Sequence, residues 1–204
     1  MEIFLTIVWL ILGYIIGSIP WALIIGLVFF KKDIRNYGSG NLGGTNAGRV
    51  LGKPIGMLVI VLDALKAFLV MWLVSAITPS AVPYAGLAVC IGHCFPVFAN
   101  FKGGKAVACS YGYLLAMGLF VTGDPVFSFV YPLLVFLIVL CLSKMVSLSS
   151  ICGMLSATLV AFLTFKVKTY AWLILILTLF VIVRHIPNIR RIIQKKESKV
   201  SFIK

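Results

Sequence analysis

Long apolar runs separated by short polar segments make up almost the whole chain. Seven runs reach or approach the length of a membrane-spanning helix, at residues 3–30, 54–77, 82–98, 106–121, 126–142, 151–165 and 169–183. An α-helix crosses the apolar layer of a bilayer with about 20 residues. The pattern therefore predicts an all-α integral membrane protein with seven transmembrane helices. Pro20 lies within the longest run, so we expect that helix to break or tilt near its middle.

The positive charges in the connections predict the orientation of these helices. Seven crossings place the two chain ends on opposite sides of the membrane. Only Lys166 and Lys168 fall on the side of the N-terminus, and Lys66 lies inside a span, which leaves fifteen of the 18 lysines and arginines on the other side. Cytoplasmic loops are enriched in these residues. We therefore expect an extracytoplasmic N-terminus, a cytoplasmic C-terminus and a basic cytoplasmic tail at about residues 184–204.

The composition supports this class and excludes others. Hydrophobic residues make up 62% of the 204 residues and charged residues 11%, too few to coat a soluble globule. Residues 1–204 are expected to form a single transmembrane domain, because the spans use nearly the whole length. The net charge of +13 comes from basic residues that are sorted by membrane side, which argues against a nucleic-acid partner. No obligate protein partner is evident. The five cysteines show no CxxC pairing, so we expect no disulfide framework, no metal site and no cofactor.

The first connection contains a polar, glycine-rich segment at residues 37–49, YGSGNLGGTNAGR. Its five glycines allow left-handed backbone conformations and a close approach to a ligand. Successive N–H groups in such turns bind anions. Arg49 closes the segment with a side chain suited to two-pronged contact with a phosphate or carboxylate. The segment is therefore predicted to bind an anionic group.

A second glycine pair precedes the fourth predicted helix in the segment FKGGK, residues 101–105. Gly103 and Gly104 would place N–H groups at a helix N-terminus, where the helix dipole favours anions. Lys102 and Lys105 add positive charge. The alternative is that both lysines only anchor the helix at the membrane surface. Phosphate binding is favoured because anchoring does not require the glycines.

Two histidines and one charged pair are further candidates for chemistry. His185 and Asn188 share a helical face at the start of the tail, where a histidine could act as a general base and an asparagine could stabilise an oxyanion. An anchoring role for His185 stays open. His93 is predicted to be a structural or supporting group. Asp63 and Lys66, three residues apart in the second helix, are expected to neutralise one another, with a direct site role as the alternative.

The serines at residues 147–150 are expected to cap the sixth helix, because serine is a preferred N-cap residue. No GxSxG elbow is present, so these serines are expected to form hydrogen bonds to substrate at most. Asp33 and Glu197 stand alone on the cytoplasmic side, which disfavours carboxylate-pair and metal catalysis.

The same count of seven crossings places the polar segments on one side of the membrane. An enzyme that joins a soluble substrate to a lipid-borne one needs a site on one face only. A phosphate or organic-anion transporter needs polar groups on both faces or along a path through the membrane. The distribution favours the enzyme, with the transporter and a lipid-binding scaffold as alternatives.

Seven motifs, in order along the chain, resemble the signature of the bacterial membrane acyltransferases that make lysophosphatidic acid from glycerol 3-phosphate and an acyl phosphate. They are Gly17-Ser18-Ile19-Pro20, the run from Asp33 through Thr45-Asn46 to Arg49, Leu62-Asp63 with Lys66, Gly92-His93 with Pro96, FKGGK at 101–105, Val146-Ser147-Leu148 with Ser150, and Arg184-His185 with Asn188 and Arg191. The resemblance covers essentially the whole chain, and the ordered set is far more specific than any one motif.

The resemblance implies transfer of a fatty acyl group from acyl phosphate to the 1-hydroxyl of glycerol 3-phosphate, with release of inorganic phosphate. The partners would be these two substrates and membrane lipid, at the cytoplasmic face of the bacterial inner membrane, with no cofactor or metal. The implied catalytic residues are His185, Asn188, Ser39 and Arg49, and the implied substrate- or phosphate-binding residues are Asn41, Thr45, Lys102, Gly103, Gly104, Lys105, Ser147 and Ser150.

Three positions depart from the family pattern. Gly44 stands where alanine is usual, Ala106 stands where another glycine is usual, and Lys195 stands where a glycine is common before Glu197. The turn before the fourth helix is therefore expected to be less permissive in this chain.

Overall fold

The computed structural model describes residues 1–200, and within that range it contains helices and turns and no strand. This confirms the all-α prediction. The chain divides into two compact units, Met1–Ala116 and Met117–Lys204. The prediction that all residues form a single domain stays a prediction.

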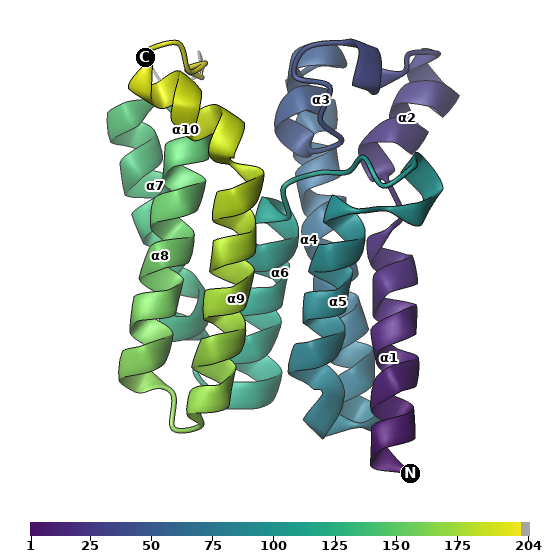
Figure 1. Ribbon diagram of the computed structural model, residues 1–204, viewed down its shortest axis with the longest axis vertical. Helices are drawn as coiled ribbons and strands as arrows, with labels where there is room; N and C mark the ends of the chain where they lie inside the picture. Colours follow the sequence, from purple (N-terminus) through teal and green to yellow (C-terminus); the bar gives the residue numbers. More distant parts are fainter. Residues whose placement is uncertain (201–204) are drawn as a thin grey trace. The chain divides into compact units, whose positions relative to one another are not determined.

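The N-terminal unit combines three long helices, α1, α4 and α5, with short helices at the end opposite the N-terminus (Figure 1). The bounds are α1 (Glu2–Gly17), α2 (Trp21–Phe30), η1 (Ile34–Asn36), α3 (Gly44–Val50), α4 (Lys53–Ile77), η2 (Pro79–Ala81), α5 (Val82–Cys94), η3 (Val97–Ala99) and α6 (Val107–Met117). The predicted break in the first span is confirmed, because α1 and α2 are separated at Ser18, Ile19 and Pro20. Proline lacks the N–H that would continue the helix.

Glycine permits two close helix crossings in this unit. A Cβ at Gly13 would lie 2.7 Å from the carbonyl oxygen of Ala85, and one at Gly17 would strike the backbone of α5. Gly13 and Gly17, spaced as a GxxxG face, therefore let α1 pack closely against α5. A Cβ at Gly44 would lie 2.7 Å from the carbonyl oxygen of Gly56. The departure from alanine at position 44 thus lets α3 lie directly on α4.

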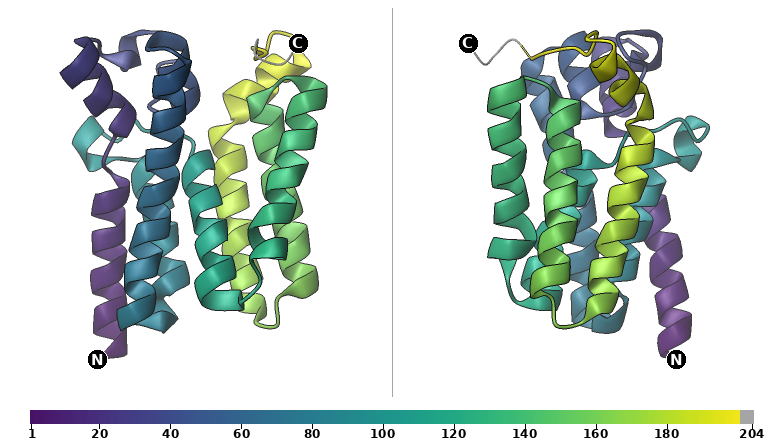
Figure 2. Two further views of the ribbon diagram at one scale, coloured as in Figure 1. Left: turned by 180° about the vertical axis from the view of Figure 1, so that it is seen from behind. Right: turned by 60° about the vertical axis from the view of Figure 1, so that its left-hand side comes forward.

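The C-terminal unit contains two π-helical turns and four α-helices. Their bounds are η4 (Gly118–Thr122), η5 (Val126–Val130), α7 (Tyr131–Ser143), α8 (Val146–Thr164), α9 (Lys168–Arg184) and α10 (Ile186–Ile193). Helix α8 packs against α7 and α9, and the three lie side by side in both figures (Figure 2). The chain bends by 58° between α9 and α10.

The predicted spans agree with the helices in most positions. Five segments of the described residues are long and apolar enough to cross a membrane, or six if α9 and α10 form one bent span. The five are Glu2–Phe30, Lys53–Ile77, Pro79–Ala99, Val126–Ser143 and Val146–Thr164. The segment Val107–Thr122, predicted as the fourth span, is shorter. The count of seven and the orientation of the termini stay predictions.

The serine run at residues 147–150 does not cap a helix, and that prediction is wrong. Helix α8 begins at Val146, and its N-cap residue is Met145. The hydroxyls of Ser149 and Ser150 donate to the carbonyl oxygens of Met145 and Val146 at 2.8 and 2.7 Å. A serine hydroxyl that donates to a carbonyl oxygen of the preceding helical turn needs no hydrogen bond with water. The serine run therefore lies within α8 and does not mark its end.

Candidate active site

A small apolar core holds the glycine-rich segment in the N-terminal unit. Ile34, Leu42 and Ala47 are buried in one cluster. The cluster also contains residues of α2, α4 and η3, namely Ala22, Leu23, Ile25, Val59 and Ala99. Burial of these side chains favours the folded loop through the hydrophobic effect. The polar residues between them are therefore held on a fixed backbone.

Asn46 organises the first half of this loop. Its side chain is buried, and its Oδ1 accepts a hydrogen bond of 2.8 Å from the backbone N–H of Ser39. Its Nδ2 donates to the carbonyl oxygens of Ile34 and Tyr37, both at 3.2 Å. One amide thus satisfies three backbone groups. This role of Asn46 was not predicted, and the available signal was a polar residue beside apolar positions that are buried.

The loop leaves three predicted site residues at the surface. Gly38 and Gly40, with φ of 61° and 68°, turn the chain on either side of Ser39. Thr45 and Arg49 lie four residues apart on one face of α3, and both are exposed, as is Ser39. The segment therefore presents two hydroxyls and a guanidinium beside a rigid backbone, as an anion site requires.

Asn41 joins the two predicted phosphate-binding segments. Its Oδ1 accepts from the N–H of Gly43 at 3.1 Å, and its Nδ2 donates to the carbonyl oxygen of Gly103 at 3.3 Å. Residues 62 positions apart are thereby connected. The sequence predicted both segments separately, and the structure brings them together.

The two glycines of the FKGGK segment serve a purpose other than the one predicted. Their N–H groups were expected to face an anion. Instead, Gly103 donates to the carbonyl oxygen of Cys94 at 3.2 Å and Gly104 to that of His93 at 3.0 Å. A Cβ at Gly104 would strike the His93 ring. Glycine is needed here because the segment lies directly against the end of α5, and this corrects the predicted role of both N–H groups.

The lysines of the same segment lie next to this fixed backbone. Lys102 is exposed and Lys105 is partly buried. Ala106, which follows them, has a φ of 59°. That left-handed conformation is unfavourable for alanine. The turn adopts this conformation with a Cβ present, and the expectation that it is less permissive stays a prediction.

A buried charge cluster of Asp63, Lys66 and His93 lies next to the glycine pair of the FKGGK segment. The Lys66 Nζ is 2.8 Å from Asp63 Oδ1 and 3.0 Å from His93 Nδ1. It also donates to the carbonyl oxygen of Ile19 at 3.2 Å. The predicted neutralising pair of Asp63 and Lys66 is confirmed. His93 contacts this pair, and its ring also lies against Gly104. The cluster therefore supports the FKGGK segment through His93.

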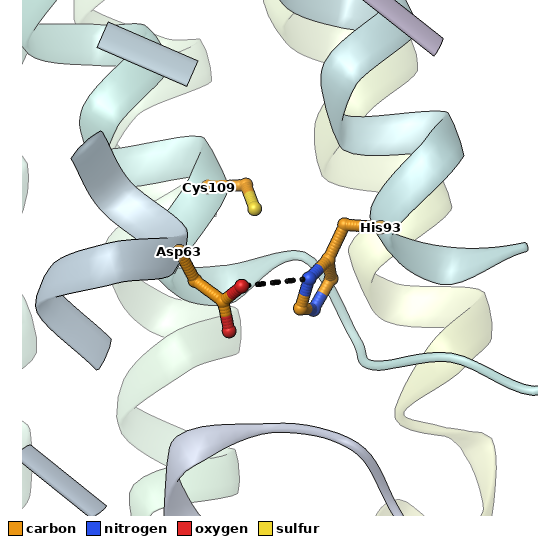
Figure 3. A group of neighbouring side chains, drawn as sticks. All are labelled: Asp63, His93 and Cys109. Carbon is orange, nitrogen blue, oxygen red and sulfur yellow. Dashed lines mark ion pairs between the residues drawn. The ribbon is translucent and has the colours of Figure 1, made fainter. Parts of the chain in front are cut away.

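Two members of this cluster, Asp63 and His93, also belong to a group with the composition of a metal site. Asp63, His93 and Cys109 offer donor atoms within 4.8 Å of one another, and Figure 3 shows the Asp63 carboxylate directed at the His93 ring, with Cys109 close by. The Lys66 ammonium, however, already contacts both the carboxylate and the imidazole. One positive charge beside the carboxylate is therefore supplied by the protein, and we assign the cluster a supporting role.

His185 lies at the bend between α9 and α10 in the C-terminal unit and is buried. Its Nδ1 is 2.8 Å from the carbonyl oxygen of Val181. A carbonyl oxygen only accepts hydrogen bonds, so this contact assigns the ring proton to Nδ1. In the neutral imidazole Nε2 is then the basic nitrogen. Pro187, in the first turn of α10, is placed where its missing N–H costs nothing.

The Glu197 carboxylate, in the same unit, accepts hydrogen bonds from three side chains. Its Oε1 accepts from Ser147 Oγ at 2.7 Å and from Asn188 Nδ2 at 2.6 Å, and its Oε2 accepts from Arg191 Nε at 2.7 Å. Burial alone would raise the pKa of this carboxyl, but the hydrogen bonds from Asn188, Ser147 and Arg191 hold the pKa below its usual value. Glu197 was predicted to stand alone, and no local pattern in the sequence indicates these three contacts.

The other isolated acid also has a partner. Asp33 accepts hydrogen bonds from the side chain of Arg35, with a shortest distance of 2.6 Å. The hydrogen bond from Arg35 lowers the pKa of the Asp33 carboxyl. Neither carboxylate therefore leaves an uncompensated negative charge in a region proposed to bind phosphate.

Comparison with known proteins assigns the family. A family model described as glycerol-3-phosphate acyltransferase matches residues 7–195. The chain belongs to this family. A glycerol-3-phosphate acyltransferase from Enterococcus faecalis is 46% identical, over 95% of this chain and 91% of the relative. The family identifies the protein as an acyltransferase enzyme.

Solved structures of the family agree in fold. A crystal structure of PlsY (YgiH), an integral membrane glycerol 3-phosphate acyltransferase in its glycerol 3-phosphate form, superposes with a TM-score of 0.86 at 34% identity and covers 96% of both chains. Its lysophosphatidic acid form gives 0.83 at 32% identity, covering 96% of this chain and 95% of the other. Together with the apolar helices, these matches identify a multi-pass membrane protein of bacterial type.

Proposed function

We propose that this acyltransferase moves a fatty acyl group from acyl phosphate to the 1-hydroxyl of glycerol 3-phosphate. The products are lysophosphatidic acid and inorganic phosphate. The observation that carries the proposal is the family match across residues 7–195, supported by similarity to structures of an enzyme in its glycerol 3-phosphate and lysophosphatidic acid forms.

In the N-terminal unit, the proposed role is to bind phosphate groups. Arg49 and Lys105 supply positive charge, and Ser39 and Thr45 supply hydroxyl donors on the backbone that Asn46 holds. Lys102 adds charge at the exposed edge. Binding of an acyl phosphate and a phosphorylated alcohol brings together negative charges that repel, so cations are the side chains that this step requires.

In the C-terminal unit, the proposed role is to prepare the attacking hydroxyl. His185 Nε2 accepts the proton of the 1-hydroxyl, while Nδ1 stays bonded to Val181 and keeps the ring oriented. The hydroxyl oxygen forms a bond to the acyl carbon, and the bond from that carbon to the phosphate oxygen breaks. The electron pair leaves with phosphate. Acyl phosphate is already activated, so positioning and charge stabilisation supply most of the rate enhancement.

The proposed topology follows from the charge distribution. Seven crossings, with the N-terminus outside and the C-terminus in the cytoplasm, place the polar segments at residues 37–49, 101–105 and 184–200 on the cytoplasmic side of the bacterial inner membrane. Glycerol 3-phosphate then enters from the cytoplasm, and the acyl chain stays in the bilayer.

A direct assay tests the function. Purified protein in detergent is mixed with palmitoyl phosphate and glycerol 3-phosphate, and phosphate release and lysophosphatidic acid are measured. We expect both products in equal amounts, and neither product when palmitoyl-CoA replaces palmitoyl phosphate. Absence of both products from the complete mixture would overturn the proposal. No observation favours the transporter, which would instead move phosphate into liposomes without forming lysophosphatidic acid.

A further inference from the structure

Helix α10 turns one face toward the protein and the opposite face outward. The chain bends by 58° between α9 and α10, and α10 lies over the end of α8 (Figure 1, Figure 2). Asn188 is buried, whereas Ile186, Arg190 and Ile193 share the opposite face and are exposed. Ile193 is 77% exposed. Two large apolar side chains with a guanidinium between them therefore face outward.

Four exposed cations lie in α10 or directly after it. They are Arg190, Lys195, Lys196 and Lys199. The acid in the same segment, Glu197, has a side chain that is only 6% exposed and is paired with Arg191. Within residues 1–200, none of the four cations forms an ion pair with an acid. The exposed side of this segment therefore has an uncompensated positive charge, although the sequence places an acid within it.

Backbone hydrogen bonds hold these cations on a folded segment. The N–H of Lys196 donates to the carbonyl oxygen of Arg191 at 2.7 Å, and the N–H of Val200 donates to that of Lys144 at 2.8 Å. Lys195 has a φ of 55°, which turns the chain away from the helix axis. The predicted basic tail is therefore attached, up to residue 200, to α10 and to the end of α7.

Helix α9 determines where this surface lies relative to a bilayer. It has 17 residues, and its charged side chains, Lys168 and Arg184, are at its two ends. At 1.5 Å per residue it is about 25 Å long, close to the apolar layer of a bilayer, which is about 30 Å thick. When α9 crosses the bilayer, as the predicted topology requires, α10 begins at the level of the lipid headgroups. A helix with exposed isoleucines and cations is suited to that level.

We propose that the outward side of α10, together with residues 194–200, is a docking surface for the headgroups of anionic phospholipids. This inference goes beyond the proposed acyl transfer and rests on α9 crossing the bilayer. Ile186 and Ile193 enter the apolar edge of the bilayer, and the four cations contact lipid phosphates. A zwitterionic lipid offers the same apolar edge without a net negative charge. Each lysine or arginine near an anionic surface strengthens the attraction by about fivefold, so anionic lipid is concentrated beside α10.

Fluorescence quenching at one position of this surface tests the proposal. Cys141 and Cys152, the cysteines that are not buried, are changed to serine, and a fluorophore is attached through Ser198→Cys, an exposed position. The protein is reconstituted into phosphatidylcholine vesicles. A small fraction of the lipid is phosphatidylglycerol with a nitroxide close to its headgroup, or phosphatidylcholine with the same nitroxide. We expect phosphatidylglycerol to quench at least about threefold more strongly at low salt, and the difference to disappear at high salt.

The matched control carries the same fluorophore through Ser80→Cys. Ser80 is also exposed, and η2, which contains it, has no lysine or arginine. The two lipids should quench equally there. At residue 198, Lys195→Gln combined with Lys196→Gln removes two charges and should bring the two lipids close to equal quenching.

Two results would overturn the inference. One is equal quenching by both lipids at residue 198 in the protein with all four cations. The other is a preference for phosphatidylglycerol that the two glutamines leave unchanged. If the double variant does not fold, Lys199→Gln is compared in the same way, with an expected loss of about half or more of the preference.

Discussion

The two units hold their candidate site residues by different means. In the N-terminal unit, glycines and two asparagine amides fasten backbone to backbone, so Ser39 and Arg49 lie on a preformed loop. In the C-terminal unit, one carboxylate, Glu197, holds side chains from α8 and α10. The first arrangement depends on the absence of side-chain volume, and the second depends on one charge. Each unit is therefore sensitive to a different class of substitution.

The largest effect is expected from His185, where the C-terminal unit depends on a single side chain. His185→Ala should lower kcat by about 10²- to 10⁴-fold, the usual contribution of a general base. His185→Asn provides the sharper comparison, because its amide N–H replaces Nδ1 as a donor to Val181 but supplies no group at Nε2. Both variants should be equally slow in the phosphate-release assay. Retention of activity by His185→Asn would show that the ring serves only as a donor to Val181.

A smaller effect is expected when volume is added to the N-terminal unit. Gly104→Ala places a Cβ against the His93 ring and should lower the free energy of unfolding by about 1–3 kcal/mol. Gly48→Ala is the matched control. Its Cβ would lie 3.5 Å from the Gly56 Cα, an ordinary contact, and alanine should raise stability by up to about 1 kcal/mol in a helix.

Denaturant titration in detergent micelles measures both glycine variants. The two substitutions should have opposite signs. Equal effects would contradict the view that Gly104, and not glycine in general, is required by contact with His93.

Lowering the pH should weaken the C-terminal unit through Glu197. Its pKa is lowered by hydrogen bonds from Asn188, Ser147 and Arg191 that outweigh burial. The resulting stabilisation is complete above the unfolded-state pKa of about 4.3 and is lost as the pH falls through the lower folded-state pKa. The unaltered protein should therefore lose more stability than Glu197→Gln on acidification below that value.

Unfolding of the two proteins at matched pH values tests this prediction. Asp33 also has a lowered pKa but titrates in both proteins, so their difference isolates Glu197. Identical pH profiles would show that the carboxylate contributes no stabilisation through its charge.

The smallest effect is expected at Ala106, where the N-terminal unit carries backbone strain. Ala106→Gly removes the Cβ from a residue with a φ of 59°. Relief of the left-handed penalty should exceed the entropy cost of glycine, for a net gain in stability of about 0.5–1 kcal/mol. Thermal unfolding in detergent should show a higher midpoint than in the unaltered protein. A lower midpoint would indicate that the methyl group of Ala106, which is fully buried, contributes more by packing.

Much of the fold could be predicted because its signals are local. The second apolar run, predicted at 54–77, is α4 at Lys53–Ile77, since hydropathy and a flanking proline both act within one helix. The break near Pro20 was predictable for the same reason. The start of α8 was predicted at residue 151 and lies at Val146. The prediction was wrong because a serine hydroxyl can donate to a carbonyl oxygen of the preceding turn, so serines do not always mark a helix end.

The sequence by itself determined the helical class and the positions of the glycine-rich and basic segments. The order of the motifs along the chain also determined the family resemblance. Only the tertiary structure decided how those segments are held. It connects Asn41 to Gly103, uses the Gly103 and Gly104 N–H groups within the backbone, and places Glu197 on Ser147 and Asn188. These contacts join residues far apart in the chain, so their free energy depends on packing that no local pattern of residues encodes.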